Sequence, residues 1–320
     1  MSTFPETVSI RTGARLHFGP LSYRPETGRS FGGIGLMVER PGVELTATSR
    51  TGRRPSGIDS PRTQQLLTSF KDRLPVLQFA FQVDLAEEIP AHQGLGSGTQ
   101  LSLALMEALL ALRGEQASIT RLAELAARGD RSAVGLYGYE QGGFLFDAGH
   151  APGESIGQLA CRVDFPEEWP VLLLHPQDAR GLSGAVELKA FEQLGAMPEL
   201  TCGRLCRLAL TELLPAIQSR NFHDFTVALF EYGQLVGDFF RQTQGGVFAS
   251  PAMRQLLQQF PHVAHTGMAQ SSWGPTIAMF AENESHASEL RRQLRELIPD
   301  QTCRIEITRA RNRGREIRIG

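Results

Sequence analysis

The alternation of apolar and polar residues predicts strands in the first part of the chain. Val8 to Leu21 has the pattern of a strand that breaks at Gly13, and two further strands follow on either side of Pro41-Gly42. Gln64 to Leu74 is predicted to be a helix. Val76 to Leu85 then alternates with a period of two, which is typical of a strand with one buried face.

The second part of the chain places apolar residues at helical spacing. A long stripe runs from Phe222 to Phe240, and a shorter one runs from Met253 to Phe260. The remaining predicted elements are a helix over Thr120 to Arg128 with Thr120 as N-cap, a strand over Phe144 to Phe146, two strands around Pro166 within Cys161 to His175, strands over Ile277 to Phe280 and Arg304 to Thr308, and a helix over Ser288 to Leu297. Strands first, then helices with strands, indicate the α+β class.

One stretch, Ile89 to Leu112, joins a turn at Pro90 to a glycine-rich loop and an almost uncharged apolar helix. Its glycines are Gly94, Gly96 and Gly98. Glycines allow backbone N–H groups to converge on a ligand, and a helix start adds unpaired N–H donors and the positive end of its dipole. The stretch therefore predicts an anion site, most naturally for a phosphate or a pyrophosphate.

The loop could also be a plain structural turn, because glycine clusters are weak signals on their own. Hydroxyls at Ser97, Thr99 and Ser102, and the position directly before a helix, favour an anion site. No Gly-Lys-Ser/Thr follows, which excludes a Walker loop, and the third glycine is misplaced for a dinucleotide fingerprint.

Length and composition set the broad class of the protein. The chain has 320 residues, 41% apolar and 21% charged, enough for two globular domains. Ala151 to Gly157 is rich in Pro, Gly and Ser, and predicts a boundary between domains 1–155 and 156–320. The net charge of −2 gives no reason to expect nucleic acid as a partner. Met1 to Arg15 has no apolar signal core and no run reaches membrane length, so we expect a cytoplasmic protein without membrane contact.

Two clusters have a structural interpretation that we prefer. Four cysteines are too few for a disulfide scaffold, and Cys202 and Cys206 have no second ligand pair at matching spacing. Free thiols on a packed helix are therefore expected, and neither of these two cysteines is assigned as a metal ligand. Six arginines between Arg304 and Arg318 could contact nucleic acid, but a charged, solvated edge strand and tail is the preferred interpretation.

Three other groups of residues could belong to the anion site, and the first lies around Arg131. Arg128 and Arg131, beside Asp130 and Ser132, suit bidentate phosphate binding, although an exposed Arg-Asp loop fits equally well.

On the first strand, His17 follows Arg15 by two residues and would point to the same face; spacing alone gives it no catalytic role. In Gln270 to Gly274, Trp273 could stack on a planar ligand while Ser271 and Ser272 donate hydrogen bonds.

Taken together, these segments resemble the GHMP kinase superfamily, whose phosphate loop has the form Pro-x3-Gly-Leu-x-Ser-Ser. Here Pro90, Gly94, Leu95 and Ser97 match, while Gly98 and Thr99 replace the second serine and the residue after it. The stretches RTGARLHFGPL, RSFGGIGLMVERPGVELTA, GLGSGTQ, RSAVGLYGYEQGGFLFDAG and QSSWGPT resemble, in this order, one branch of that superfamily, the β-ribofuranosylaminobenzene 5′-phosphate synthase family.

The resemblance implies a two-domain α+β fold with mixed sheets and packed helices, and a particular reaction. Phosphoribosyl pyrophosphate would react with 4-aminobenzoate, or with 4-hydroxybenzoate, losing pyrophosphate and carbon dioxide in tetrahydromethanopterin biosynthesis. Mg²⁺ is the expected cofactor, with no organic cofactor, and the partners are small-molecule substrates. The oligomeric state stays open, and the resemblance is compatible with a homodimer.

Residue roles follow from this resemblance together with the residue chemistry. The expected catalytic residues are Ser97, Asp130 and Arg131, with Asp130 as metal ligand or general base. The expected substrate-binding residues are Arg15, His17, Gly94, Gly96, Gly98, Thr99, Gln100, Ser132, Gln270, Ser271, Ser272, Trp273 and Gly274. The alternatives are an ATP-dependent small-molecule kinase of the same superfamily and a binding protein that uses the arginine-rich tail on RNA.

Overall fold

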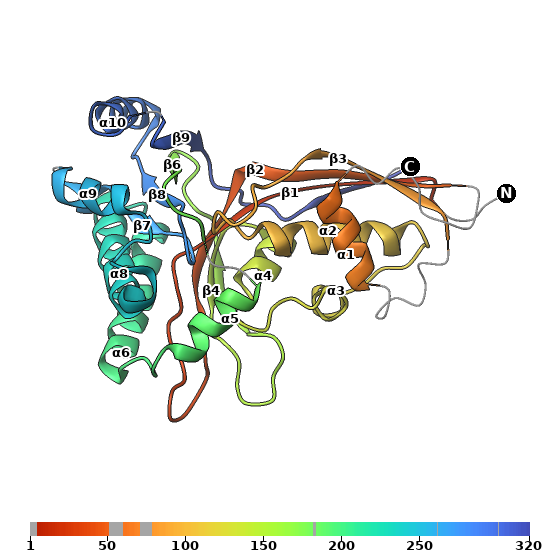
Figure 1. Cartoon of the computed structure of the whole chain (residues 1–320), viewed down its shortest axis with the longest axis horizontal. Helices are drawn as coiled ribbons and strands as arrows, with labels where there is room; N and C mark the ends of the chain where they lie inside the picture. Colours follow the sequence, from red (N-terminus) through yellow and green to blue (C-terminus); the bar gives the residue numbers. More distant parts are fainter. Residues whose placement is uncertain (1–4, 51–59, 71–78, 182–183, 261, 300) are drawn as a thin grey trace.

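The structure is a computed structural model of the whole chain (Figure 1). It describes all residues except 1–4, 51–59, 71–78, 182–183, 261 and 300, and only the backbone of 184–188. None of the described helices is both long enough and apolar enough to cross a membrane.

A six-stranded sheet forms the larger layer of the molecule. Its strands are β1 (Thr7–His17), β2 (Gly33–Ser49), β3 (Phe81–Glu87), β4 (Phe144–Asp147), β5 (Leu159–Val163) and β10 (Glu316–Ile319). The order is β10-β1-β2-β4-β5. β4 pairs with the first residues of β2, and β3 pairs with its last residues. All these pairs are antiparallel.

Four helices cover one face of this sheet (Figure 1). They are α1 (Pro61–Phe70), α2 (Ser97–Ala111), α3 (Ile119–Ala126) and α4 (Val134–Gln141). The central helix α2 packs against β1 and β2, and nearly all its side chains are buried. This explains its apolar sequence, because a helix enclosed by a sheet and other helices has no solvent face.

A four-stranded antiparallel sheet forms the second layer, in the order β7-β8-β6-β9. Its strands are β6 (Val171–Pro176), β7 (Ala269–Gln270), β8 (Ile277–Phe280) and β9 (Cys303–Thr308). The helices of this half are α5 (Gly184–Gln193), α6 (Glu199–Arg207), a π-helical turn (Leu208–Leu213), α7 (Leu214–Gln218), α8 (Phe222–Gln244), α9 (Pro251–Gln259), a 3₁₀ turn (Val263–Thr266) and α10 (Glu284–Leu297). The predicted stripe on α8 is confirmed, since Phe225, Leu229 and Phe240 are buried.

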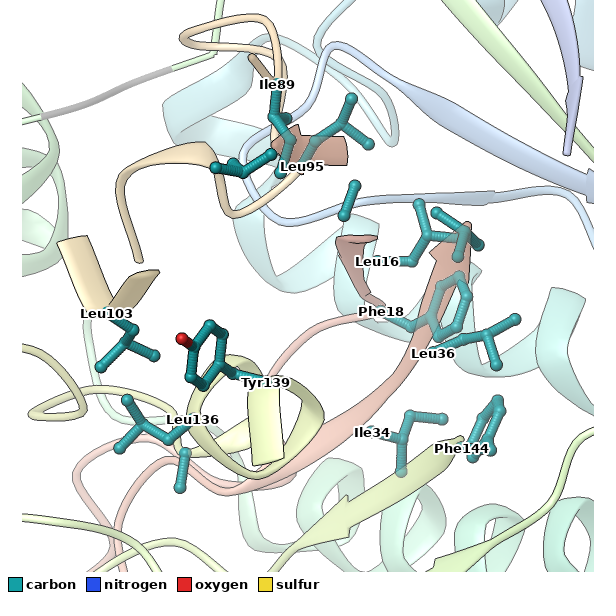
Figure 2. Packing of buried hydrophobic residues seen from close by; sticks show 14 of the residues in the cluster. Leu16, Phe18, Ile34, Leu36, Ile89, Leu95, Leu103, Leu136, Tyr139 and Phe144 are labelled. Carbon is teal, nitrogen blue, oxygen red and sulfur yellow. The ribbon is translucent and has the colours of Figure 1, made fainter. Parts of the chain in front are cut away.

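The main apolar core is continuous between the two sheets. Phe18, directly after β1, lies 6.2 Å from Phe144 of β4 and 6.3 Å from Phe280 of β8 between ring centroids. Figure 2 shows Leu16 and Phe18 on one side of the first sheet, close to Leu36 and Phe144. The end of β1 therefore packs against both halves of the molecule, and this packing fixes the position of the residues next to Phe18.

Several predicted elements are confirmed and three are corrected. The predicted strand break at Gly13 is only a shift of pairing register between Gly13 and Ala14: β1 continues through it and ends at His17, before the predicted end at Leu21. Pro41-Gly42 does not separate two strands: β2 continues through it, and the extra residues form a bulge opposite Gly13. The N-cap of α3 is Ser118, not Thr120, because the Ser118 side chain accepts a hydrogen bond from the backbone N–H of Arg121.

Two other predictions extend into residues outside the described part of the chain. The predicted helix over Gln64 to Leu74 is described as α1 up to Phe70. The strand predicted from Val76 is described from Phe81, as β3.

The predicted boundary between residues 155 and 156 does not separate the two sheets. Ala151 to Gly157 connects β4 to β5, which are neighbours in the six-stranded sheet. The C-terminal strand β10 returns to this sheet and pairs with β1. Composition could not reveal this, because a long loop between paired strands has the same Pro, Gly and Ser content as a linker.

The arginine-rich C-terminal segment is not simply solvated. Arg311 is only 1% exposed and forms ion pairs with Glu39 and Glu316, at 2.8 and 3.0 Å. Arg315 pairs with Glu107 of α2 at 2.6 Å. The structure therefore corrects the interpretation of a purely solvated tail. The predicted strand Arg304 to Thr308, described as β9, does lie at an edge of its sheet, and β10 is a further strand that was not predicted. The four cysteines are free, as expected.

Candidate active site

The glycine-rich loop turns sharply into the start of α2. Gly94 and Gly96 both have left-handed backbones, with φ of 75° and 70°. A Cβ on Gly94 would lie 2.2 Å from the carbonyl oxygen of Ser271, so no other residue fits there without movement of the chain. The carbonyl of Leu95 accepts a hydrogen bond from the backbone N–H of Arg15 at 3.0 Å, which attaches the loop to β1.

The turn over residues 270–274 completes this attachment from the second half of the chain. The Ser271 hydroxyl donates to the Gly94 carbonyl at 2.7 Å and accepts from the backbone N–H of His17 at 3.0 Å. The backbone N–H of Ser272 donates to the His17 carbonyl at 2.6 Å. Three segments that are far apart in the sequence are therefore joined by hydrogen bonds at one place.

A basic cavity of about 540 Å³ opens over this loop. Four arginines line it together with the loop backbone: Arg15, Arg62, Arg128 and Arg131. No carboxylate is among its lining residues in the described part of the chain. The guanidinium groups and the N-terminus of α2 make this cavity suitable for a multiply charged anion.

Arg62 reaches the cavity from α1, on a segment that the sequence did not connect with the site. Its guanidinium donates to the Ser97 hydroxyl at 2.8 Å and pairs with Glu88 at 2.5 Å. Ser97, which is 8% exposed, is thereby held at the first position of α2. No local pattern marked Arg62, because its role depends on where α1 packs.

A second cavity of about 110 Å³ adjoins the basic cavity. The two share five lining residues, which are Arg15, Thr99, Arg128, Arg131 and Ser272. The walls of the smaller cavity include Pro20, Phe31 and Phe191, and its polar lining includes His17, Asp130 and Ser132. The Arg131 guanidinium lies 5.5 Å from the centre of the Phe191 ring. This arrangement suits a small planar molecule that carries a negative charge.

His17 is buried in the wall of the smaller cavity. Burial, and then the charge of Arg15, lower the pKa of His17 well below 6.5, so the imidazole is neutral at pH 7. Its backbone is fixed on both sides by the hydrogen bonds to Ser271 and Ser272.

Four of the expected site side chains are held within the protein. The Gln100 amide is buried, donates to the Gly135 carbonyl and accepts from the Thr12 hydroxyl, each at 2.9 Å. The Gln270 amide accepts from the Ala249 N–H at 2.7 Å and donates to the Ser272 carbonyl at 3.1 Å. Both amides therefore hold protein backbone in place. The Ser271 hydroxyl does the same through its hydrogen bonds to Gly94 and His17.

Trp273 is the fourth of these side chains. It is 5% exposed and packs 5.1 Å from Phe191 and 4.5 Å from Phe240 between ring centroids. It lines neither of the two cavities, whereas Phe191, against which it packs, lines the smaller one. Gly274 faces Gln270. A Cβ on Gly274 would lie 2.8 Å from the Gln270 Cδ, so a larger residue would not fit there.

A buried carboxylate that the sequence did not single out organises the Asp130–Ser132 segment. Asp147 is 1% exposed and accepts from the N–H groups of Ala133 and Gly149 at 2.7 and 2.9 Å. Burial raises the pKa of Asp147. Asp130 itself is exposed at the smaller cavity. Asp147 fixes the start of α4, and with it the direction in which this segment enters the site.

Two family models match the chain. The model of the GHMP kinase N-terminal domain matches residues 63–143, and the model of the GHMP kinase C-terminal domain matches residues 213–300. The chain belongs to the GHMP kinase superfamily. The predicted family and fold class are confirmed.

Relatives within the superfamily match almost the whole chain. A protein of Archaeoglobus fulgidus named beta-ribofuranosylphenol 5'-phosphate synthase is 29% identical, over 97% of this chain and 99% of its own length. A protein of Methanothermobacter thermautotrophicus with the same name is 28% identical, over 95% of this chain and 97% of its own.

Solved GHMP kinase structures share the fold. The homoserine kinase of Cytophaga hutchinsonii superposes with a TM-score of 0.65 at 14% identity, covering 99% of both chains. The mevalonate diphosphate decarboxylase of Staphylococcus aureus gives a TM-score of 0.65 at 13% identity, covering 98% of both.

The departure from the usual GHMP loop at Gly98 leaves space beside Arg128. The backbone of Gly98 is helical and does not need a glycine, and a Cβ there would be in ordinary van der Waals contact with the Arg128 guanidinium, at 3.4 Å. Arg128 also donates to the Ser102 hydroxyl at 3.2 Å. In this GHMP protein an arginine lies against the start of α2, where the usual motif has a second serine, whose hydroxyl would extend into the same space.

Proposed function

We propose that the protein catalyses decarboxylating phosphoribosyl transfer from phosphoribosyl pyrophosphate to 4-hydroxybenzoate or 4-aminobenzoate. The products would be pyrophosphate, carbon dioxide and a β-ribofuranosyl phenol or aniline 5′-phosphate. The relatives' name describes the phenol product. The observation that carries the proposal is the aromatic-walled cavity that shares three arginines with the large basic cavity.

The basic cavity supplies what departure of a diphosphate requires. Breaking the bond between ribose C1 and the diphosphate leaves positive charge on the ribose and moves negative charge onto the leaving group. The backbone around Gly96 to Thr99, the N-terminus of α2 and the arginine side chains are fixed donors directed at that charge. Ser97, Arg131 and the remaining loop residues take this role in the proposal.

The smaller cavity supplies what the aromatic acid requires. Phe31 and Phe191 offer ring faces, and the shared arginines offer partners for a carboxylate. Because the two cavities adjoin, a ring carbon in one can lie next to ribose C1 in the other. Such placement of two reactants accounts for several powers of ten in rate.

The donor set suits a magnesium ion that enters with the diphosphate. In the described part of the chain, no three His, Cys, Asp or Glu side chains lie together as a metal-binding group. Asp130 lines the smaller cavity, and Mg²⁺ in proteins usually has one or two carboxylates in addition to phosphate oxygens and water. The diphosphate would hold the ion, with Asp130 as a ligand where the two cavities adjoin, and the ion would neutralise charge on the leaving group.

The test is release of labelled carbon dioxide. The protein with Mg²⁺, phosphoribosyl pyrophosphate and carboxyl-labelled 4-hydroxybenzoate or 4-aminobenzoate is expected to release the label and form pyrophosphate in equal amounts. Arg131→Met should lower the rate at least tenfold, because a charge-assisted contact is lost. Arg220→Met, which removes an exposed ion pair with Glu168, is the matched control. Formation of ADP with ATP and an alcohol, without label release, would instead support a GHMP-type kinase.

A further inference from the structure

A histidine that lines the smaller cavity has a ring nitrogen without a hydrogen-bond partner in the described part of the chain. It is the Nε2 of His17, a buried atom in a side chain that is 8% exposed. Burying a polar nitrogen without a partner destabilises the folded protein, so a ligand that completes the bonding here would gain affinity.

The residue beside this buried nitrogen is a glycine. A Cβ at Gly33 would come within 2.8 Å of Nε2, so the glycine leaves that side of the ring free of a side chain. The backbone of His17 is fixed by hydrogen bonds to Ser271 and Ser272, so the ring is presented from a rigid position. His17 lines the smaller cavity and not the basic one, whereas Arg15, Arg128 and Arg131 line both.

This separation orients an aromatic acid. The carboxylate is attached to the ring carbon that bonds to ribose, so it must lie at the junction of the cavities, where the arginines are. The substituent at position 4 is on the opposite side of the ring and points away from that junction. We infer, on the basis of the proposed function, that the 4-hydroxyl of the aromatic acid binds His17 Nε2, and that this nitrogen accepts the phenolic proton during the reaction.

The step balances without an oxidant or a reductant. Pyrophosphate leaves with the electron pair of its bond to ribose C1, and the ring carbon that bears the carboxylate bonds to that C1. The phenolic proton moves to His17 Nε2, which leaves a cyclohexadienone. Cleavage of the carbon–carboxylate bond returns its electron pair to the ring and releases carbon dioxide, and the ring oxygen takes the proton back from the imidazolium. A neutral imidazole suits the first transfer, and the lowered pKa of His17 keeps it neutral beforehand; the imidazolium that results suits the return of the proton.

Binding tests the contact independently of turnover. By calorimetry with Mg²⁺ and pyrophosphate present, the wild-type protein should bind 4-hydroxybenzoate about tenfold more tightly than benzoate, the difference expected from one good hydrogen bond. His17→Ala should abolish this preference and leave benzoate and pyrophosphate affinities within about twofold. His17→Phe, which fills the space without an acceptor, replaces the alanine variant if that variant does not fold. A preference that persists in either variant would overturn the contact.

Turnover tests the proton transfer. His17→Gln keeps a hydrogen-bond acceptor but cannot take a proton, so kcat for label release should fall about a hundredfold while KM for 4-hydroxybenzoate changes little. His223→Gln, at an exposed histidine on α8, is the control. An unchanged kcat in His17→Gln would overturn the proton transfer and leave the proposed function standing. No label release by the wild-type protein would overturn the proposed function, while the binding measurement would still decide the contact.

Discussion

The hydroxyl of Ser271 donates a hydrogen bond to the carbonyl of Gly94 at 2.7 Å, across 177 residues of sequence. The same oxygen accepts from the backbone N–H of His17 at 3.0 Å. One small side chain therefore joins the phosphate loop, the end of β1 and the turn from the second half. The loop and both cavities depend on this junction for their shape.

Ser271→Ala should destabilise the protein and weaken anion binding. The substitution leaves the Gly94 carbonyl and the His17 N–H, both at a buried serine, without their partner, which should lower the free energy of unfolding by about 1–3 kcal/mol. Denaturant unfolding and pyrophosphate titration measure the two effects. Ser219→Ala, at an exposed serine with a hydrogen bond only to the local Pro215 carbonyl, should change neither. Wild-type stability in Ser271→Ala would show that the junction does not depend on this hydroxyl.

Gly98→Ser, which restores the usual GHMP loop, should weaken pyrophosphate binding without unfolding the protein. The new Cβ would already be in van der Waals contact with the Arg128 guanidinium, at 3.4 Å, so the serine hydroxyl beyond it would compete with Arg128 for the space at the start of α2. We expect roughly tenfold lower affinity, equivalent to about 1.4 kcal/mol, by calorimetry. Gly203→Ser on α6 is the matched control, because a Cβ there meets nothing within 4 Å. Equal affinities in the two variants would remove the explanation given for Gly98.

Arg311→Met should destabilise the protein by about 3–5 kcal/mol. The substitution removes the buried guanidinium and leaves the carboxylates of Glu39 and Glu316 without that ion-pair partner. Arg313 pairs with the same two glutamates but is 61% exposed. Arg313→Met should therefore lower the free energy of unfolding by less than about 1 kcal/mol. Urea unfolding of the two variants gives the comparison. Similar small effects would restore the interpretation of a solvated tail.

Stability should fall as the pH drops below 6.5, in part because of His175. Burial, and then the charge of Arg304, lower the pKa of His175 to about 4. The folded pKa lies below the unfolded value near 6.5, so the unfolded chain binds the proton first. The stabilisation is complete above pH 6.5 and is lost progressively down to pH 4, by roughly 2 kcal/mol at pH 5.

The measurement is the unfolding free energy at pH 7.5 and pH 5 for the wild-type protein and His175→Gln. The variant should lose less stability between the two pH values, whatever its stability at pH 7.5. His286→Gln, at a half-buried histidine of α10, serves as the control and should keep the wild-type difference. An identical pH dependence in His175→Gln would exclude His175 as a source.

Sequence patterns predicted the parts of this fold that depend on local chemistry. The alternation in β1, the apolar stripe of α8 and the apolar helix after the glycine loop each follow from burial of one face or of the whole element. The family was visible for the same reason, since Pro90, Gly94, Leu95 and Ser97 are neighbours in sequence and form one turn. Patterns over a few residues are sufficient where the physical constraint also spans a few residues.

The tertiary structure alone decided which side chains line the two cavities. Trp273 and Gln270 have the chemistry of a binding site, but packing turns the indole toward Phe240 and the amide toward Ala249. Arg62 and Phe191 have no distinguishing local pattern, yet α1 and α5 bring them to the cavities. Direction depends on contacts between residues that are distant in the chain, and periodicity carries no information about those contacts. The sequence therefore determined the glycine-rich loop and the helix that follows it, and the packing of both halves around His17 determined what lies beside them.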